Sequence, residues 1–301
     1  MKATTASMYL FRSTIVAAAI SVASAMPSWA GSLFLTGHDP DFHAFMGGNF
    51  TGARNINQAA INYVTDSTFN TFTANGVNKF LFVESKIRPP VGYTNGVKGI
   101  VASGYRPGVD FDHHNFSTLN SALDQLGTTY NAIVIASTGG GVLTQAELDI
   151  LNARSSDIIN FLNAGGGLYA MSESKTRANL APNGGYYGFL PFVASSVAHG
   201  GHEDNYSVTP FGASLGLTNS DINGNYSHTI FTQTSGLSIL DVDGEGNILS
   251  LAGRGNIDPE NGLARVPEPS STLGLLTFGV FCVGSLLKRK RQQKVLDSSV
   301  S

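Results

Sequence analysis

Continuous apolar runs and helically spaced apolar residues alternate along the middle of this chain. The runs at Ser32–Thr36, Phe80–Val83 and Ala132–Ala136 are typical of strands that are covered on both faces. Between them, apolar residues recur at helical spacing over Gly52–Phe72 and again from Leu119 to Leu126, a helix for which Ser117 is the expected cap. This alternation predicts an α/β domain with a mostly parallel sheet.

The clearest unit lies in the second half of this region. Thr144 and Glu147 form a capping box that opens a helix extending to Leu162. Three glycines end that helix, and Leu168–Met171 reads as the next strand. A strand, helix and strand in this order imply a right-handed crossover, so we predict a flavodoxin-like three-layer sandwich. The chain after Gly184 is less regular and is expected to add edge strands and loops.

A membrane-length apolar stretch lies near the C-terminus. Residues 270–287 carry no charge, and about 18 residues at about 1.5 Å each nearly cross a hydrocarbon core of about 30 Å. The stiff, extended segment Pro267-Glu268-Pro269 precedes the stretch. Four consecutive cations follow it, and the positive-inside rule keeps them in the cytoplasm and places the rest of the chain outside. These cations are Lys288, Arg289, Lys290 and Arg291.

The N-terminus carries a matching export signal. Lys2 and Arg12 precede the apolar stretch Ile15–Ala25, and small residues stand at the positions that determine cleavage. This pattern predicts a secretory signal peptide, exported by the Sec machinery and cut between Ala30 and Gly31. The predicted organisation is a signal peptide at 1–30, an α/β domain at 31–257, a linker at 258–269, a transmembrane helix at 270–287 and a basic cytoplasmic tail at 288–301.

The order of Pro267-Glu268-Pro269, apolar span and basic cluster resembles the PEP-CTERM sorting signal of Gram-negative exopolysaccharide producers. The resemblance implies an exosortase-type membrane protease as a partner, which recognises and cuts this tail. It also implies a final location at the cell surface or in the extracellular matrix, with exopolysaccharide as a candidate partner. An ordinary single-pass tail anchor is the alternative interpretation.

Composition narrows the functions that the domain can have. The only cysteine, Cys282, lies in the predicted span, so the exported region has neither a disulfide nor a cysteine nucleophile. With 13% charged residues and a net charge of −3, the chain also lacks the clustered cations of a nucleic-acid-binding protein.

A second resemblance covers about half of the domain. The segments around Tyr130–Ile135, Leu143-Thr144 and Gly165–Leu168 resemble the class I glutamine amidotransferase-like superfamily. In that superfamily a catalytic cysteine follows the strand that ends here at Met171, but this chain has Ser172 at the turn. The resemblance therefore implies the fold and not the amidotransferase activity.

Ser172 is nevertheless a candidate nucleophile, with His202 as base and Glu203 as the orienting carboxylate. The glycines of a nucleophile elbow are missing around it, so a helix-capping role is the alternative.

Histidines and carboxylates form polar clusters that suit a divalent metal such as zinc. Turn-forming side chains without a metal are the alternative interpretation. The candidate ligands are His38, Asp41, His43, His199 and His202.

Asp241, Asp243 and Glu245 match the first positions of a calcium loop, but Ala252 stands where the bidentate glutamate belongs. A plain β-hairpin with an Asp-Gly turn fits this segment better.

Two functional classes follow from the sequence. The first is an exported surface or matrix protein whose domain is a non-catalytic binding or structural module. The second is a secreted hydrolase that uses a crevice around Ser172 and the histidines.

Overall fold

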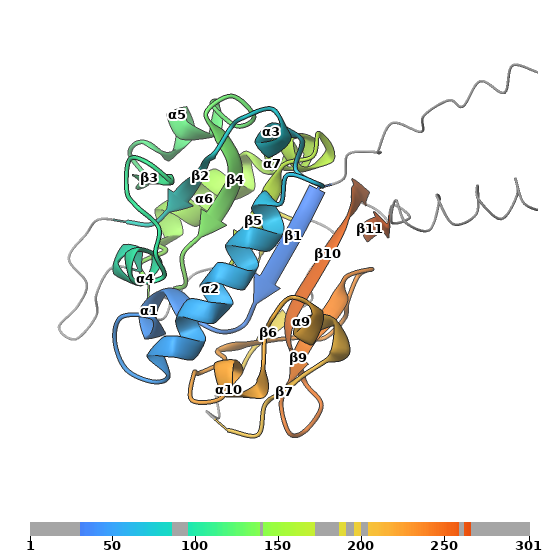
Figure 1. The fold of residues 1–301 in the computed structure, drawn as a ribbon. Helices are drawn as coiled ribbons and strands as arrows, with labels where there is room; N and C mark the ends of the chain where they lie inside the picture. The colour runs from blue at the N-terminus through green and yellow to red at the C-terminus, as the bar shows by residue number, and fades with distance from the viewer. Residues whose placement is uncertain are drawn as a thin grey trace, which may run out of the picture.

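A mixed β-sheet runs through the molecule (Figure 1). The computed structural model describes residues 31–85, 96–138, 141–171, 187–190, 196–199, 204–258 and 262–265. The predicted signal peptide, membrane span and basic tail lie outside these ranges. Among the helices within them, none has the length and apolar character needed to cross a membrane.

Five strands form the parallel half of the sheet, in the order β3-β2-β4-β5-β1. They are β1 (Gly31–Thr36), β2 (Lys79–Val83), β3 (Phe111–His114), β4 (Tyr130–Ile135) and β5 (Gly167–Ala170). The predicted α/β class and the mostly parallel central strands are thereby confirmed. The strand order differs from the flavodoxin order, in which the first strand lies inside the parallel set, because β1 here lies between β5 and an antiparallel strand.

The long strand β10 (Ile248–Asp258) connects the two halves of the sheet by pairing antiparallel with β1. It also pairs antiparallel with β8 (Thr229–Phe231) and β9 (Ser238–Val242), and these pair in turn with β6 and β7. The remaining strands of this half are β6 (Ser196–Ala198), β7 (Ser207–Val208) and β11 (Gly262–Arg265). Two short helices cover it: α9 (Pro210–Ser214) and α10 (Asn219–Ile222).

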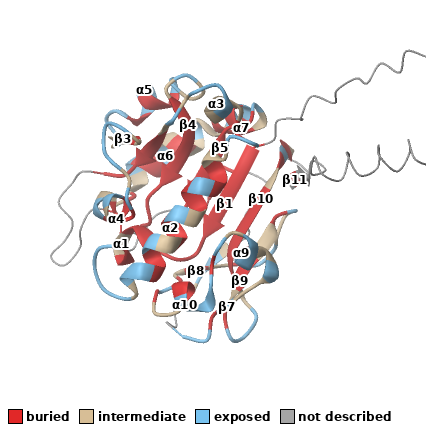
Figure 2. Ribbon diagram, viewed as in Figure 1, coloured by how far each residue is buried: buried red, intermediate tan, exposed pale blue. Residues whose placement is uncertain are grey.

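Helices cover both faces of the parallel strands because their side chains alternate between two hydrophobic clusters (Figures 1 and 2). Leu33 and Leu35 of β1 belong to one cluster, whereas Phe34 belongs to the other. The Phe34 side packs against α2 (Phe50–Thr65) and α4 (Val97–Ala102), with α1 (Pro40–His43) beside them. The opposite side packs against α5 (Leu119–Leu123), α6 (Gln145–Ala153) and α7 (Ser155–Asn163), and α3 (Thr71–Ala74) contacts β4.

Helix boundaries follow local capping more closely than apolar periodicity. The predicted helix Gly52–Phe72 ends at Thr65, and α3 follows after Asn70, which caps it by accepting from the Thr73 amide. The predicted capping box of Thr144 and Glu147 is confirmed, but its helix is interrupted at Arg154 between α6 and α7.

The α5 cap is at Thr118 rather than at the predicted Ser117, and no side-chain hydrogen bond caps this helix. The Asn115 side chain instead accepts from the Ser117 amide at 3.1 Å, which holds Ser117 in the turn before the helix.

The predicted linker at 258–269 begins too early. Residues Gly262–Arg265 form β11, which pairs antiparallel with β10 and places Arg265 opposite Gly255. Leu263 is only 6% exposed and belongs to a core cluster, and hydrophobic burial accounts for this ordered edge strand. A single residue, Val266, therefore separates the folded sheet from Pro267.

We expect Leu263→Ala to lower the free energy of unfolding by about 2 kcal/mol, because it removes buried methyl groups from the contact between β11 and the core. Urea unfolding followed by circular dichroism measures this change. Val109→Ala is the matched control, since Val109 is 54% exposed and should change stability by less than about 0.5 kcal/mol. Equal midpoints for the two variants would show that β11 contributes nothing to the core.

Candidate functional site

Polar residues that follow three parallel strands meet at the carboxyl edge of the sheet. Asp41 comes after β1, Glu84 directly after β2 and Ser137 after β4. The chain leaves β2 toward α4 on one face and leaves the adjacent β4 toward α6 on the other. Such a topological switch point is where open α/β sheets place their ligand crevice. The carboxyl edge between β2 and β4 is therefore the candidate site.

The Glu84 side chain is fully buried and accepts three backbone hydrogen bonds. Its Oε1 accepts from the amide of Gly96 and, at 3.1 Å, from the amide of Val142. Its Oε2 accepts from the amide of Val97 at 3.0 Å and lies 3.4 Å from Nε2 of His113. One side chain thus joins the end of β2 to the start of α4 and to the loop after β4.

Asp41 is held in the same way at the end of β1. Its Oδ2 accepts from the Ser137 amide at 2.9 Å, and its Oδ1 accepts from the Phe42 amide at 3.0 Å. Gly96 and Gly141 lie so close to Oδ2 that a Cβ on either residue would overlap it. Both positions therefore require glycine for Asp41 to occupy this place.

Burial shifts both carboxyl groups toward their neutral forms. Burial and the nearby negative charge of Asp41 raise the pKa of Glu84 to about 8, against the lowering effect of its three amide donors. Burial also raises the pKa of Asp41 to about 6, although hydrogen bonds from Ser137 oppose that rise. At neutral pH Glu84 is therefore mostly protonated and Asp41 mostly ionised, so two negative charges do not face each other inside the protein.

Two imidazoles share the buried carboxylate of Asp39. Nε2 of His43 lies 3.2 Å from Oδ1, and Nε2 of His228 lies 3.3 Å from Oδ2. The ring of Tyr226 stacks between the two imidazoles, with centroid distances of 6.4 Å to His43 and 5.7 Å to His228. This cluster joins the loop after β1 to the segment before β8.

Both ring nitrogens of His43 face groups that accept hydrogen bonds, and this favours the doubly protonated ring. Its Nδ1 lies 2.9 Å from the carbonyl oxygen of Gly47, which can only accept, and its Nε2 faces Asp39. Burial alone would lower the pKa of His43, but the hydrogen bond to Asp39 and its charge raise the pKa to about 9. Burial would likewise raise the pKa of Asp39, yet His228 and His43 hold it well below its usual range.

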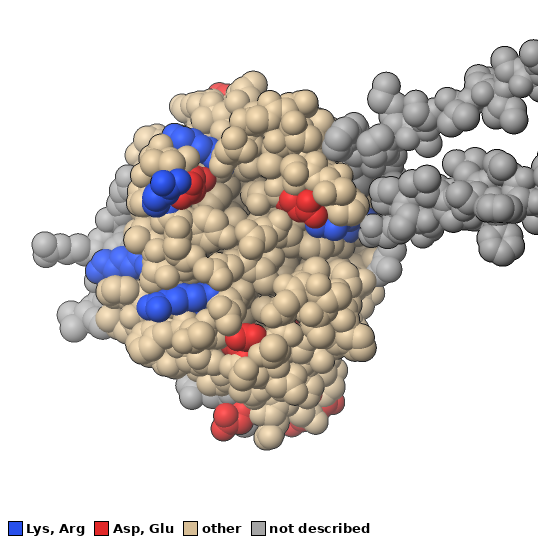
Figure 3. All heavy atoms as spheres, in the orientation of Figure 1, with Lys and Arg blue, Asp and Glu red and all other residues tan. Residues whose placement is uncertain are grey.

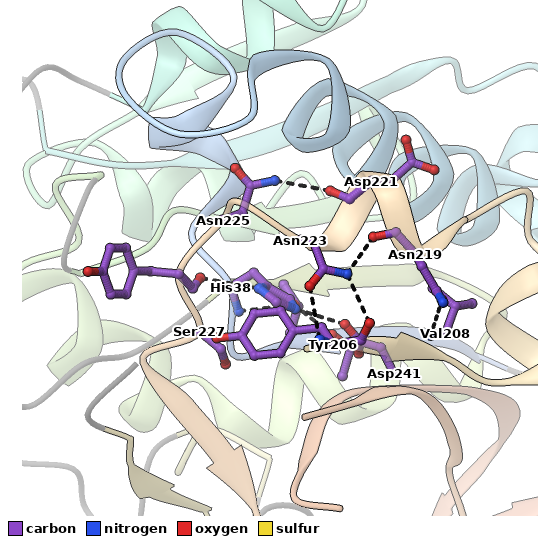
Figure 4. Close-up of polar contacts among 12 residues, drawn as sticks. His38, Tyr206, Val208, Asn219, Asp221, Asn223, Asn225, Ser227 and Asp241 are labelled. Atoms are coloured by element: carbon purple, nitrogen blue, oxygen red, sulfur yellow. Dashed lines mark hydrogen bonds and ion pairs between the residues drawn. The ribbon is translucent and has the colours of Figure 1, made fainter. Parts of the chain in front are cut away.

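His38 points into the interface with the antiparallel half of the sheet (Figure 4). Its Nε2 lies 2.8 Å from Oδ2 of Asp241, and its Nδ1 lies 3.2 Å from the carbonyl oxygen of Tyr226. Both partners of the pair are only 1% exposed, so neither side chain is available to a ligand.

Asparagines fix the loops around this pair (Figure 4). Asn223 accepts from the Tyr206 amide at 2.9 Å and donates back to the Tyr206 carbonyl at 2.9 Å. Asn219 accepts from the Val208 amide, and Asn225 donates to the backbone carbonyl of Asp221. These amide groups provide hydrogen bonds inside the protein without adding charge.

The described metal candidates do not come together as one site. His38 pairs with Asp241, His43 with Asp39, and Asp41 with backbone amides, while Nε2 of His199 lies 3.6 Å from Asp243. Within the described ranges no group of three or more His, Cys, Asp or Glu side chains is arranged to hold a metal ion. Each of these side chains instead has a partner of its own.

The hairpin interpretation of the predicted calcium segment is confirmed. β9 and β10 pair antiparallel, and the Asp243 side chain organises the turn by accepting from the amides of Glu245 and Asn247 at 2.9 and 2.8 Å. Asp241 turns inward to His38, so it does not converge with Asp243 and Glu245 on one ion. Among the described residues, these three side chains therefore do not form a calcium site.

Ser172, His202 and Glu203 lie outside the described residues.

Glu84, Asp39 and His228 are the residues that the sequence interpretation missed at this edge. Glu84 had a recognisable signal, because it is a carboxylate placed directly after an apolar strand. His228 had none, since its contact with Asp39 joins residues that are far apart in the chain.

Comparisons with protein-family models, curated proteins and solved structures gave no match for this chain.

We expect the stability of the protein to fall as the pH rises from about 5 to about 9. Glu84 and Asp41 have raised folded-state pKa values, so both contribute fully to stability below about pH 4. The contribution of Asp41 is lost as the pH passes about 6, and that of Glu84 is lost as the pH passes about 8. The raised pKa of His43 likewise makes stability fall as the pH rises to about 9. The pKa of Asp39 is lowered, so Asp39 makes stability rise with pH, but only in the acidic range. Urea unfolding across this range should show a loss of several kcal/mol, since the three shifts act in the same direction and one pKa unit corresponds to about 1.4 kcal/mol.

Glu84→Gln should flatten this profile between about pH 4.5 and 8, because the amide does not titrate. Asp149→Asn, which removes an exposed carboxylate on α6, is the matched control and should retain the wild-type slope. If Glu84→Gln keeps that slope as well, Glu84 does not titrate in this range.

Proposed function

We propose that this chain is exported and that its C-terminal tail first anchors it with the α/β domain outside the cell. The domain is a non-catalytic binding or structural module. In this proposal the Sec machinery exports the chain, and residues 270–287 span the inner membrane of a Gram-negative bacterium. An exosortase-type protease then cuts at or near Pro267-Glu268-Pro269. The mature domain is left at the cell surface or in the extracellular matrix.

One observation carries the non-catalytic part of the proposal. The backbone amides of Gly96, Val97 and Val142, which point into the switch-point edge, are all taken by Glu84. Amides in such positions are the donors that a bound anionic ligand would use in other α/β proteins. Here the protein's own carboxylates occupy that place.

The positions of the two domain ends support the export part. β1 begins at Gly31, the residue after the predicted cleavage site, and Gly31 is buried within the sheet. Arg265, the last residue of β11, precedes the sorting motif by one residue. Gly255 of β10 pairs with Gly31 on one side and with Arg265 on the other, so both ends of the domain leave the same edge of the sheet (Figure 1).

The combined change Pro267→Ala and Pro269→Ala should leave uncut protein in the inner membrane. The processed fraction is expected to fall at least about tenfold, because the extended segment that the protease would read is lost. Membrane fractionation and immunoblotting of the secreted protein measure the effect. The pair Ser271→Ala and Thr272→Ala, just beyond the motif, is the matched control and should be processed normally. Normal surface release of the proline variant would show that the tail is an ordinary anchor.

The hydrolase hypothesis gives the opposite result in a labelling experiment. A serine-directed fluorophosphonate probe should leave the purified protein unlabelled if the domain is non-catalytic, and in-gel fluorescence measures this. Labelling that disappears in Ser172→Ala but persists in Ser174→Ala would overturn the non-catalytic proposal.

A further inference from the structure

Exposed apolar side chains gather on the outer surface near the end of β1. Phe45, Met46 and Phe50 lie in and beside the segment between α1 and α2, with exposed fractions of 42%, 36% and 44%. Arg54 and Lys98 are the exposed cations beside them. We call these five side chains the aromatic–cationic patch. Exposed apolar groups that gather on one surface can mark a binding site.

Contacts and helical spacing connect most of the patch. Nζ of Lys98 lies 5.1 Å from the centroid of the Phe45 ring, in cation–π geometry. Nε of Arg54 donates to the carbonyl oxygen of Ala44 at 3.0 Å, which brings α2 beside the end of α1. Phe50 and Arg54 stand one turn apart on α2, so they share a face of that helix.

The two cations of the patch differ from the other cations of the described structure. Six Lys and Arg side chains are described, and four of them form ion pairs with carboxylates: Lys79, Arg106, Arg154 and Arg254. Among the described residues, Arg54 and Lys98 have no carboxylate within ion-pair distance. On the face shown in Figure 3, blue side chains lie over the region of α1, α2 and α4 without a red group between them. The patch therefore presents positive charge that the described protein does not neutralise.

We propose that the aromatic–cationic patch binds an anionic polysaccharide of the polyuronate type. Carboxylates spaced along such a polymer can pair with Arg54 and Lys98, while the C–H faces of its sugars pack on the negative faces of Phe45 and Phe50. This inference rests on the proposed placement of the domain outside the cell, and it names the partner and the surface that the binding module would use.

Two other polyanionic partners fit the patch less well. Nucleic acids carry about one charge per 3.4 Å of strand and are bound through many phosphate contacts, whereas this patch offers two free cations. The patch lies near the carboxyl end of β1, whereas Gly31 and Arg265 lie at the opposite end of the sheet (Figure 1). A membrane that binds the patch would have to approach from the side of the patch. Before the proposed cut, a chain that is tethered after Arg265 therefore holds the patch away from its own bilayer.

Binding of the purified full chain to immobilised alginate, a polyuronate, tests the inference. In biolayer interferometry at low salt, the pair Arg54→Gln and Lys98→Gln should weaken binding at least about tenfold, because both charge contacts are lost. Phe45→Ala should weaken it severalfold, and added salt should weaken wild-type binding as well. Neutral dextran should not bind.

The matched control is the pair Lys79→Gln and Arg106→Gln, which removes the same charge from ion-paired positions away from the patch. It should change alginate binding less than about twofold. Absence of wild-type binding, an equal loss in this control, or stronger binding to phosphatidylglycerol vesicles than to alginate would overturn the inference.

Antibody access to the chain on intact cells tests the export of the domain separately. A displayed chain that does not bind alginate refutes only this inference. A chain that is never exported refutes the proposed function.

Discussion

The carboxyl edge of this sheet depends on one set of contacts: the buried Glu84 carboxyl group accepts hydrogen bonds from three backbone amides. Parallel strands and the first turns of helices leave amides that require acceptors once water is excluded. Glu84 provides those acceptors for α4 and for the loop after β4, and Asp41 does the same for Ser137. These side chains therefore occupy the switch point, the place where open α/β sheets have their ligand crevice.

The two halves of the molecule depend on each other. β10 belongs to both, and the pair of His38 and Asp241 fastens the loop after β1 to β9. The imidazoles on Asp39 add a second connection from the same loop to the segment before β8. Polar residues that resemble a reactive cluster in the sequence thus act as internal connections, so loss of one of them should disturb both halves together.

The sequence predicted the elements whose signal is local. Apolar runs identified β1, β2 and β4, and the capping box identified the start of α6, because each depends on residues a few positions apart. β3 was missed because this edge strand buries only Phe111 and carries Asp112 and two histidines on its half-exposed part. The site was harder still, since His38 meets Asp241 across 203 positions and Glu84 meets Val142 across 58. Such pairings are set by strand order, which no local pattern records.

The position of β11 has a mechanical consequence. Arg265 is the free end of an antiparallel pair, so tension on the tail would load the hydrogen bonds to β10 one at a time, beginning opposite Gly255. Bonds loaded in sequence resist far less force than bonds loaded together. Tension on the tail would therefore peel β11 first and detach Gly262–Arg265 from the sheet. The pairing of β1 with β10, on the other side of Gly255, would stay intact while β11 detaches.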